Sequence, residues 1–308
     1  MMSTVSIVIP AHNAERTLSS AVSSVLSQST KVEEVIIVEN GSTDNTLEIA
    51  REIERLHSTV RVTKSEPGVS VARNFGIALS NSDYVGFLDA DDEYRSDAIE
   101  CLKYFLDRSS VDFTKGNLQH CFSDHTRIWR PNLKVFNVSS SLEIEADYPD
   151  FVGIYCGLYR RDFLNEFDAP FPVGVHTAED RVFVWKTLLH GARFIHVDKV
   201  VYNYDRTSES SVLKKVDGPH FDLFKAYEII RKDNNLENAN AAEFKFWLQY
   251  ISMMEFTYRA PGRLSREGKR TWLKLSRAAI KPIRNSSVYR KIYQSSDANR
   301  RSFLAKIA

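Results

Sequence analysis

Short apolar segments alternate with helical patterns through the first hundred residues, and this alternation restricts the chain to few folds. Residues 5–9 and 35–38 are apolar and rich in β-branched side chains, as in strands buried on both faces, and residues 60–63 and 84–88 are further short strand patterns. Apolar residues recur at helical spacing between them: residues 17–27, 46–56 and 70–80. Such alternation predicts an α/β fold, with a mostly parallel sheet flanked by helices.

Polar residues follow three of these strands directly. The three clusters are Pro10-Ala11-His12-Asn13, Glu39-Asn40-Gly41-Ser42 and Asp89-Ala90-Asp91-Asp92. Ligands bind beyond the carboxyl ends of the strands in sheets of this kind, so we expect the clusters to meet at one edge of the sheet.

The acidic cluster predicts a metal site. Carboxylates this close together repel one another unless a cation or hydrogen bonds stabilise them. Mn²⁺ or Mg²⁺ typically binds one or two carboxylates together with a substrate diphosphate, which makes Asp89 and Asp91 candidate ligands. For an isolated Asp-x-Asp, the alternative is a solvated acidic turn before a helix, where the helix dipole also favours carboxylates.

The other two clusters point to nucleotide binding and to turn formation. Glu39 and Asn40, at a strand end, can accept hydrogen bonds from a base or a ribose. Gly41 permits a tight turn, and Asp44 can cap the helix that follows. Arg73 is expected near the same edge, although an ion pair on the surface explains it equally well on its own.

Four ordered motifs resemble the family-2 glycosyltransferases, inverting enzymes with the nucleotide-binding GT-A fold. The matching segments are residues 7–13, 39–46, 68–77 and 84–92. The ordered set is far more specific than any single motif. The resemblance covers the first hundred residues, becomes weaker after them and is absent beyond about residue 212. It is closest to the members that build bacterial surface polysaccharides.

The resemblance implies a role for each matching residue. The nucleotide-sugar-binding residues would be Pro10, Ala11, Asn13, Glu15, Glu39, Asn40, Arg73, Asp89 and Ala90. Asp91 would bind Mn²⁺ or Mg²⁺ directly, and Asp89 would contact the ribose or complete the metal shell. Asn40 departs from the aspartate that is usual at its position, but its side-chain oxygen can still accept from a pyrimidine imide.

A second acidic pair, Glu179 and Asp180, opens a helix predicted at residues 179–190. Acidic residues are favoured at a helix start by the dipole alone. The pair also resembles the family's catalytic Glu-Asp, which implies that Asp180 is the general base and that Glu179 supports the site. An inverting transfer needs such a carboxylate to take the proton of the acceptor hydroxyl. It needs no covalent intermediate, and we find no Ser/His or Cys/His pair.

Several further residues are open to two interpretations. Arg206 and Lys214 are candidates to contact a diphosphate. His196 lies in an apolar strand pattern, where a core histidine is the more common explanation. Tyr202 and Tyr204 alternate with Asn203 across the two faces of a strand, and their rings would either stack on a sugar or pack in the core. His176, beside the acidic pair, is equally ambiguous.

The sequence predicts a catalytic domain at residues 1–215 and a basic helical region at residues 216–308. The whole chain has a net charge of +1, yet the residues from Arg259 onward include fourteen basic and two acidic ones. Such an imbalance suggests an anionic partner for the C-terminal region. Anionic lipid, which would bring the enzyme to a lipid-linked acceptor, and a negatively charged glycan both suit it. A helical bundle with a solvated basic face is the alternative, and no motif supports nucleic acid.

We expect a cytosolic enzyme, with peripheral contact to the inner face of a membrane as an option. The N-terminus has a strand pattern instead of a leader, and no apolar run approaches the roughly 20 residues that span a bilayer. The three cysteines show no CxxC spacing and are interpreted as buried thiols of a reducing compartment. The Gln-x-x-Arg-Trp motif of processive family members is missing, so we expect single or distributive transfers.

The predicted function is transfer of a hexosyl or N-acetylhexosaminyl group from a nucleotide-sugar, with a UDP-sugar favoured, to a glycan or lipid-linked acceptor. A sugar nucleotidyltransferase is one alternative. It would be expected to carry a glycine-rich basic loop after the first strand, where this chain has residues 11–16 without glycine. A non-catalytic nucleotide-sugar-binding module is the other alternative, which Asp91 and Asp180 argue against.

Overall fold

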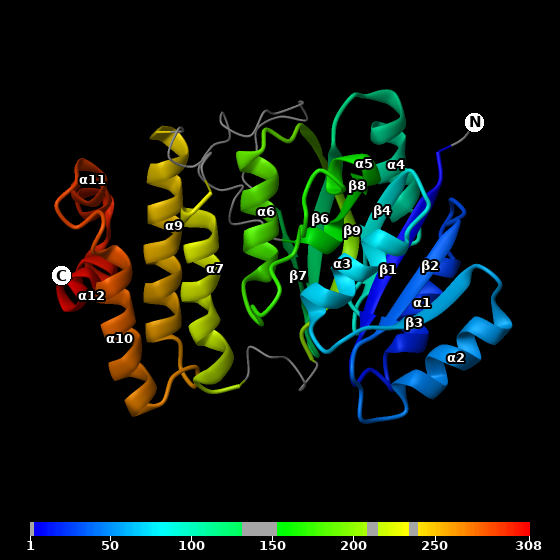
Figure 1. The fold of residues 1–308 in the computed structure, drawn as a ribbon, viewed down its shortest axis with the longest axis horizontal. Coiled ribbons are helices and arrows are strands. Elements are labelled where there is room, and N and C mark those ends of the chain that lie inside the picture. Colours follow the sequence, from blue (N-terminus) through cyan, green and yellow to red (C-terminus); the bar gives the residue numbers. More distant parts are fainter. Residues whose placement is uncertain (1–2, 131–152, 208–214, 234–239) are drawn as a thin grey trace. The chain divides into compact units, whose positions relative to one another are not determined.

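The computed structural model describes residues 3–130, 153–207, 215–233 and 240–308 (Figure 1). The chain divides into two compact units, residues 1–174 with 190–208 and residues 175–189 with 209–308. Helix α6 (Glu179–Leu189) is thereby grouped with the C-terminal helices, although it precedes residue 215, where the sequence predicts the boundary.

One sheet organises the first unit, and in the described part of the chain it has nine strands. Their bounds are β1 (Val5–Ala11), β2 (Glu34–Glu39), β3 (Val60–Lys64), β4 (Tyr84–Phe87), β5 (Glu93–Tyr94), β6 (Phe113–Cys121), β7 (Thr126–Trp129), β8 (Gly157–Arg160) and β9 (Phe194–Asp205). The strand order is β3-β2-β1-β4-β8-β6-β9-β5, with β7 beside β6. The first four strands are parallel, as predicted, and β8 runs antiparallel to β4 and β6. The predicted α/β fold is therefore confirmed.

Strand β1 is longer than the sequence pattern predicts, because Pro10 and Ala11 belong to it instead of following it. Pro10 is opposite Val38 and Ala11 is opposite Glu39 on β2. Proline has no amide hydrogen, so it is tolerated only where the ladder does not need one. The backbone N–H and C=O groups of the even-numbered residues of β1 point toward β4. The pairing of these two strands ends at Val8, so the missing N–H of Pro10 interrupts no hydrogen bond between them.

Helices cover this sheet. They are α1 (Leu18–Leu26), α2 (Thr46–Leu56), α3 (Val69–Leu79), α4 (Ala98–Arg108) and the short α5 (Arg161–Leu164), with a 3₁₀ turn at Ile154–Cys156. Helix α3 packs on β1 and β2, and α4 packs on β6, β8 and β9. The approach of α3 is so close that a Cβ atom at Gly76 would lie 2.3 Å from Val8 Cγ1. Any larger residue at this point of the helix would therefore have to displace the Val8 side chain.

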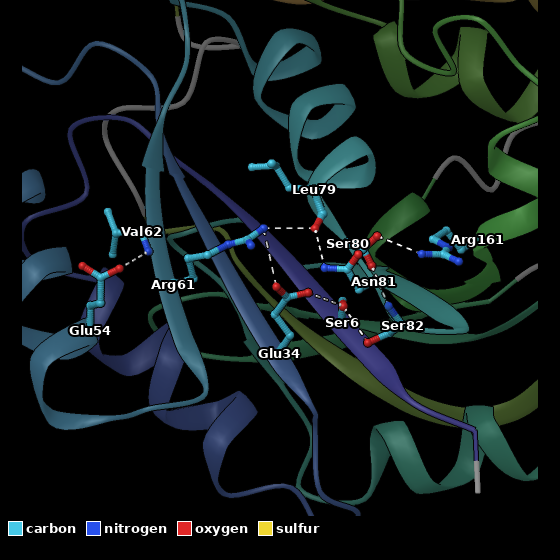
Figure 2. A network of polar contacts seen from close by, with 10 residues as sticks. All are labelled: Ser6, Glu34, Glu54, Arg61, Val62, Leu79, Ser80, Asn81, Ser82 and Arg161. Atoms are coloured by element: carbon cyan, nitrogen blue, oxygen red, sulfur yellow. Dashed lines mark hydrogen bonds and ion pairs between the residues drawn. The ribbon is translucent and has the colours of Figure 1, made fainter. Parts of the chain in front are cut away.

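Polar contacts join the amino ends of the strands, at the edge opposite the predicted site (Figure 2). The Ser6 hydroxyl donates to the Glu34 carboxylate at 2.9 Å and lies 2.8 Å from Ser82 Oγ. Arg61 donates to the carbonyl of Leu79 at 3.0 Å and lies 3.5 Å from Glu34. These contacts tie β1, β2 and β3 to the end of α3, so this edge of the sheet serves the stability of the fold.

The second unit is helical, as predicted for the C-terminal region. Besides α6, it contains α7 (Asp222–Arg231), α9 (Asn240–Arg259), α10 (Arg266–Ile280), α11 (Ser287–Ser295) and α12 (Ala298–Ile307), preceded by a 3₁₀ turn at Gly218–Phe221. Their shared core is rich in aromatic rings, and Gln249 is buried within it. Its side-chain oxygen accepts from Trp185 Nε1 at 2.6 Å and from the Tyr227 hydroxyl at 3.0 Å.

Two expectations drawn from the sequence can be compared with this fold. None of the helices in the described ranges has the length and apolar character needed to cross a membrane. The three cysteines are free, as expected, but only Cys156 is buried, while Cys101 and Cys121 are half-exposed. The expectation of three buried thiols is thus wrong for two of them, because Cys101 lies on a partly exposed face of α4 and Cys121 at the end of β6.

The contact between α3 and β1 leads to a stability prediction. We expect Gly76→Ala to lower the free energy of unfolding by about 1–3 kcal/mol, because the added methyl group overpacks Val8. The helix propensity of alanine alone would act the other way, by roughly 0.5–1 kcal/mol. Urea denaturation measures the sum. Ala78→Gly, at an exposed position of the same helix, gives the propensity difference as a control. A Gly76→Ala protein that is more stable than the parent would contradict the close contact.

Candidate functional site

The polar segments that follow β1 and β2 are joined to each other. Asn13 has a φ of 49°, in the left-handed region that asparagine tolerates better than most residues. Its Oδ1 accepts the amide of Thr43 at 2.8 Å, and its own amide donates to Ser42 Oγ at 3.1 Å. The Glu15 carboxylate accepts from the Asn45 side chain at 2.9 Å. The predicted meeting of these two strand ends is therefore present.

Asp44 and Glu39 both hold the turn after β2. Asp44 accepts the amide of Thr46, the first residue of α2, at 3.0 Å, but the N-cap of α2 is Asn45, whose side chain forms no cap hydrogen bond. Glu39 is 5% exposed, and its Oε1 accepts the amides of Gly41 at 2.8 Å and of Ser42 at 2.5 Å. Gly41 has a φ of 92°, which other residues rarely adopt. One carboxylate oxygen of Glu39 is thus engaged in shaping the turn.

Asn40 differs from its neighbours because it has an unused acceptor. The residue is 4% exposed, and its Oδ1 has no hydrogen-bond partner among the described residues. Its backbone amide donates to the Ala11 carbonyl at 3.0 Å, which fixes the residue at the end of β2. A buried acceptor without a donor costs roughly 1–3 kcal/mol, so the side chain is suited to a donor on a ligand.

Arg73 is buried instead of lying on the surface. Its side chain is 4% exposed and donates to Asp89 Oδ1 at 2.7 Å. Its guanidinium lies 5.4 Å from the centre of the Phe171 ring. Phe171 is in turn fixed by two hydrogen bonds between its backbone and the Asn74 side chain, at 2.8 and 3.0 Å. The alternative of a surface ion pair is therefore wrong, and the pair links α3 to the acidic cluster after β4.

The acidic cluster is crowded and largely shielded from water. Burial, and then the neighbouring charge of Asp89, raise the pKa of Asp91 to about 6. The same two causes, with Asp91 as a further neighbour, raise the pKa of Asp92 well above its usual range. Asp205, at the end of β9, adds to the repulsion on Asp91. Ala90 is buried between the carboxylates.

Tyr202 holds this cluster in place. Its buried hydroxyl donates to Asp92 Oδ2 at 2.9 Å and accepts the amide of Asp89 at 3.2 Å. Asp92 Oδ1 accepts the amide of Asp205 at 2.7 Å. The Tyr202 ring stacks on Tyr155, with ring centres 4.6 Å apart. From the sequence, Tyr202 was expected either to stack on a sugar or to pack in the core. Its hydrogen bonds to the acidic cluster and the contact of Asp205 with Asp92 were not predicted. Only the Tyr-x-Tyr pattern had drawn attention to this segment.

The cluster fits a divalent cation only in part. Its donors are carboxylate oxygens, which hard cations prefer, and a cation would relieve the repulsion that raises the pKa of Asp91. In the described ranges, however, no three side chains of His, Cys, Asp or Glu are arranged to hold a metal ion on their own. Mg²⁺ and Mn²⁺ need few protein ligands when a substrate diphosphate supplies the others. The donor set is thus compatible with a metal bound together with a ligand.

Glu179 and Asp180 lie in the first turn of α6, in the second unit. Ala178, directly before them, has a φ of 68°, and the Arg181 amide donates to Asp180 Oδ1 at 2.7 Å. His176 explains how this segment is held: its backbone amide donates to Asp222 on α7 at 2.9 Å, and its ring nitrogen lies 2.7 Å from the same carboxylate. His176 is therefore placed to anchor the start of α6.

The remaining candidates separate clearly. His196 is 8% exposed with Nε2 2.9 Å from Asn117 Oδ1, and burial with the nearby Lys115 lowers its pKa to about 4. It is a neutral core residue, as expected. Arg206 is exposed, with its guanidinium 5.3 Å from the centre of the Tyr204 ring. Lys214 lies outside the described residues.

The Tyr202 contacts give a prediction. Tyr202→Phe removes the hydroxyl between Asp89 and Asp92 and leaves a buried amide without an acceptor. We expect the free energy of unfolding to fall by about 1–3 kcal/mol, measured in urea. Tyr204→Phe is the matched control, because no hydrogen bond joins its hydroxyl to another described residue. A loss for Tyr202→Phe no larger than that for the control would mean that the hydroxyl does not hold the cluster.

Known proteins resemble this chain in sequence. Over 211 residues it is 28% identical to the uncharacterized glycosyltransferase YibD of Escherichia coli (strain K12), a match that covers 65% of this chain and 60% of that one. Over 104 residues it is 40% identical to a chondroitin synthase of Pasteurella multocida (strain Pm70), covering 33% of this chain and 11% of that one. The chain thus spans less than two thirds of the length of these relatives.

Solved structures share the fold. Staphylococcus aureus TarS 1–349 in complex with UDP superposes with a TM-score of 0.73 at 18% identity, covering 99% of this chain and 88% of that one. The mannosyltransferase PcManGT of Pyrobaculum calidifontis, in complex with GDP-Man and Mn²⁺, gives a TM-score of 0.53 at 16% identity, covering 100% and 84%. At this identity the likeness shows the GT-A fold alone.

The family is defined by the sequence of the first unit. The family model described as glycosyl transferase family 2 matches residues 6–167, which include the strand-end clusters and Arg73. This match takes in more than half of the chain. The protein therefore belongs to glycosyl transferase family 2.

Proposed function

We propose that this chain is an inverting, metal-dependent glycosyltransferase that moves a sugar from a nucleoside-diphosphate sugar, with a UDP-sugar favoured, to a hydroxyl of a glycan or lipid-linked acceptor. The observation that carries the proposal is the convergence of three strand ends in a family-2 chain. One end carries the unused Asn40 acceptor, and another the crowded carboxylates Asp89 and Asp91. The catalytic domain would comprise residues 1–215, with the basic helical region following it.

Donor binding is proposed to use the edge of the sheet. Asn40 Oδ1 would accept the imide N–H of uracil, because it is buried at the end of β2 and has no described partner. Pro10, Ala11 and Asn13 would border the nucleoside on one side, together with Glu15. Glu39 shapes the turn beneath it through Gly41 and Ser42. The complex of TarS with UDP supports a uridine donor by analogy of fold.

The diphosphate is proposed to meet the acidic cluster. Asp91 would hold Mn²⁺ or Mg²⁺ with help from Asp89, and a bound metal would offset the negative charge of the leaving diphosphate. Arg73 orients Asp89 through their 2.7 Å contact. Tyr202 fixes the backbone of the same loop. The complex of PcManGT with Mn²⁺ supports a metal in this fold.

Asp180 is proposed as the general base, with Glu179 supporting it. During transfer, the acceptor oxygen would bond to the anomeric carbon while the bond from that carbon to the diphosphate breaks. Asp180 would take the acceptor proton, so that no covalent enzyme intermediate forms. Removal of a general base typically costs 10²–10⁴-fold in rate.

The class of reaction can be tested with purified protein and a panel of UDP-, GDP- and dTDP-sugars. With Mn²⁺ and crude acceptor extracts, we expect release of nucleoside diphosphate from one donor. EDTA and Asp91→Ala should abolish it, and Asp180→Asn should reduce kcat by roughly 10²–10⁴-fold. Asp162→Asn, which neutralises an exposed carboxylate on α5, serves as the control and should leave the rate unchanged.

The alternatives correspond to other outcomes of the same assay. No release from any donor would favour a non-catalytic module that binds nucleotide-sugars. Release that survives both Asp91→Ala and Asp180→Asn would mean that the catalytic site lies elsewhere.

Base recognition gives a separate prediction. Asn40→Leu removes the acceptor at nearly constant volume, and we expect UDP to bind roughly 5–100-fold more weakly by calorimetry, since one hydrogen bond in a buried site is lost. Asn40→Asp restores an acceptor and should recover most of the affinity. Equal UDP affinity in all three proteins would show that Asn40 does not contact the base.

A further inference from the structure

Helix α10 of the second unit carries a line of cations. Six basic residues belong to α10 or its C-cap, and five of them occur at intervals of four, four, three and four residues: Arg266, Arg270, Lys274, Arg277 and Lys281. The sixth, Lys269, lies outside this line, with its Nζ 5.7 Å from the centre of the Tyr258 ring. At about 100° per residue the five positions fall within roughly 80° of one another on the helix surface, and over about 22 Å of its length. All five are exposed. We refer to these five residues as the α10 stripe.

Burial of the apolar side of α10 determines that the stripe faces away from the core of the second unit. Trp272 and Ile280 are both fully buried in the core of the second unit. Trp272 Nε1 also donates to the Met254 carbonyl on α9 at 3.0 Å, which prevents rotation of the helix. At its start, the Ser265 hydroxyl accepts the amide of Gly268 at 2.9 Å as a cap. The stripe is therefore a rigid feature of the surface.

The stripe contributes few contacts to the fold. None of its cations forms an ion pair with a carboxylate of the described residues. Of the five, only Arg277 donates to another described residue: its Nε and Nη2 donate to the Lys306 carbonyl on α12 at 3.1 and 2.8 Å. Like charges four residues apart destabilise a helix by a few tenths of a kcal/mol per pair, and Arg266 in the first turn opposes the helix dipole, whereas Arg277 in the last turn is favoured by it. Five cations at these positions are better explained by a ligand than by stability.

The shape of the stripe favours an extended polymer over a lipid surface. A helix that binds at a bilayer interface inserts its apolar face, and here that face is occupied by the core. The exposed large apolar residues of the described second unit, Val216, Phe256 and Tyr293, all lie outside α10. A narrow line of charges matches the repeating charges of a linear chain better than it matches a plane.

We propose that the α10 stripe binds a linear polyanionic glycan that carries a negative charge on each repeat. The inference rests on the proposed function in one respect, namely that the bound polymer is the acceptor of the transferred sugar. Binding of the polymer to the stripe itself does not require a nucleotide-sugar donor. The charges act over about 10 Å at ordinary salt concentrations, so binding should weaken steeply as salt is raised. Oligomers too short to contact all five cations should bind more weakly than long ones.

Binding can be measured with the full chain and fluorescently labelled polygalacturonate, with neutral dextran as the uncharged polymer. We expect Arg266→Gln, Arg270→Gln and Lys274→Gln together to weaken polygalacturonate binding at least tenfold and to reduce its dependence on salt. Glutamine keeps the helix propensity, and circular dichroism checks the fold. The matched control removes three exposed cations elsewhere, through Lys31→Gln, Arg127→Gln and Arg290→Gln, and should change binding less than twofold.

Three results would overturn the proposal: equal weakening by both triple variants, equal binding of dextran, or binding of phosphatidylglycerol vesicles without binding of the polymer. The last would assign the stripe to a membrane. Release of nucleoside diphosphate from the donor alone, without polymer, should be the same in the stripe variant and the parent. If neither protein releases nucleoside diphosphate, the proposed function is refuted. The measurement of polymer binding still tests the stripe independently.

Discussion

Parallel pairing of β1 with both β2 and β4 is the constraint on which the candidate site depends. Because the three strands run the same way, their carboxyl ends share one edge of the sheet, and the segments that follow them come together. The pairing is itself fixed by burial on both faces and by the approach of α3 at Gly76. The network around Ser6 and Arg61 holds the opposite edge (Figure 2). The amino-end edge of the sheet thus stabilises the fold, while the carboxyl-end edge carries the candidate site.

The acidic loop after β4 shows how the fold tolerates an unfavourable arrangement. Asp91 and Asp92 are forced together by their place in the chain, and burial makes their ionisation harder still. Three contacts from other elements offset part of the repulsion: Arg73 on Asp89, the Tyr202 hydroxyl on Asp92, and the Asp205 amide on Asp92. Groups held in this way are common at functional sites, where a ligand supplies the compensation that the protein leaves out.

The second unit is stabilised mainly by packing of aromatic side chains, which surround a few buried polar groups. Gln249 satisfies Trp185 and Tyr227 together, so its burial costs little. Because Trp272 is buried in this core, the charged side of α10 faces outward. Five of the fourteen basic residues from Arg259 onward are therefore aligned on this one helix face.

Local patterns in the sequence were enough to predict the α/β class, the four parallel strands, the three polar strand ends and the helical C-terminal region. Each of these depends on patterns within a few neighbouring residues, such as β-branched runs or the turn at Gly41, and local patterns are visible in one dimension. The roles of Asn40 and Asp180 remain predictions at that level. Three features became visible only in the folded chain: Arg73 is buried against Asp89, Pro10 belongs to β1, and Tyr202 bridges Asp89 and Asp92. These contacts join residues from 16 to 113 positions apart, and only the pairing of the strands brings such distant residues together.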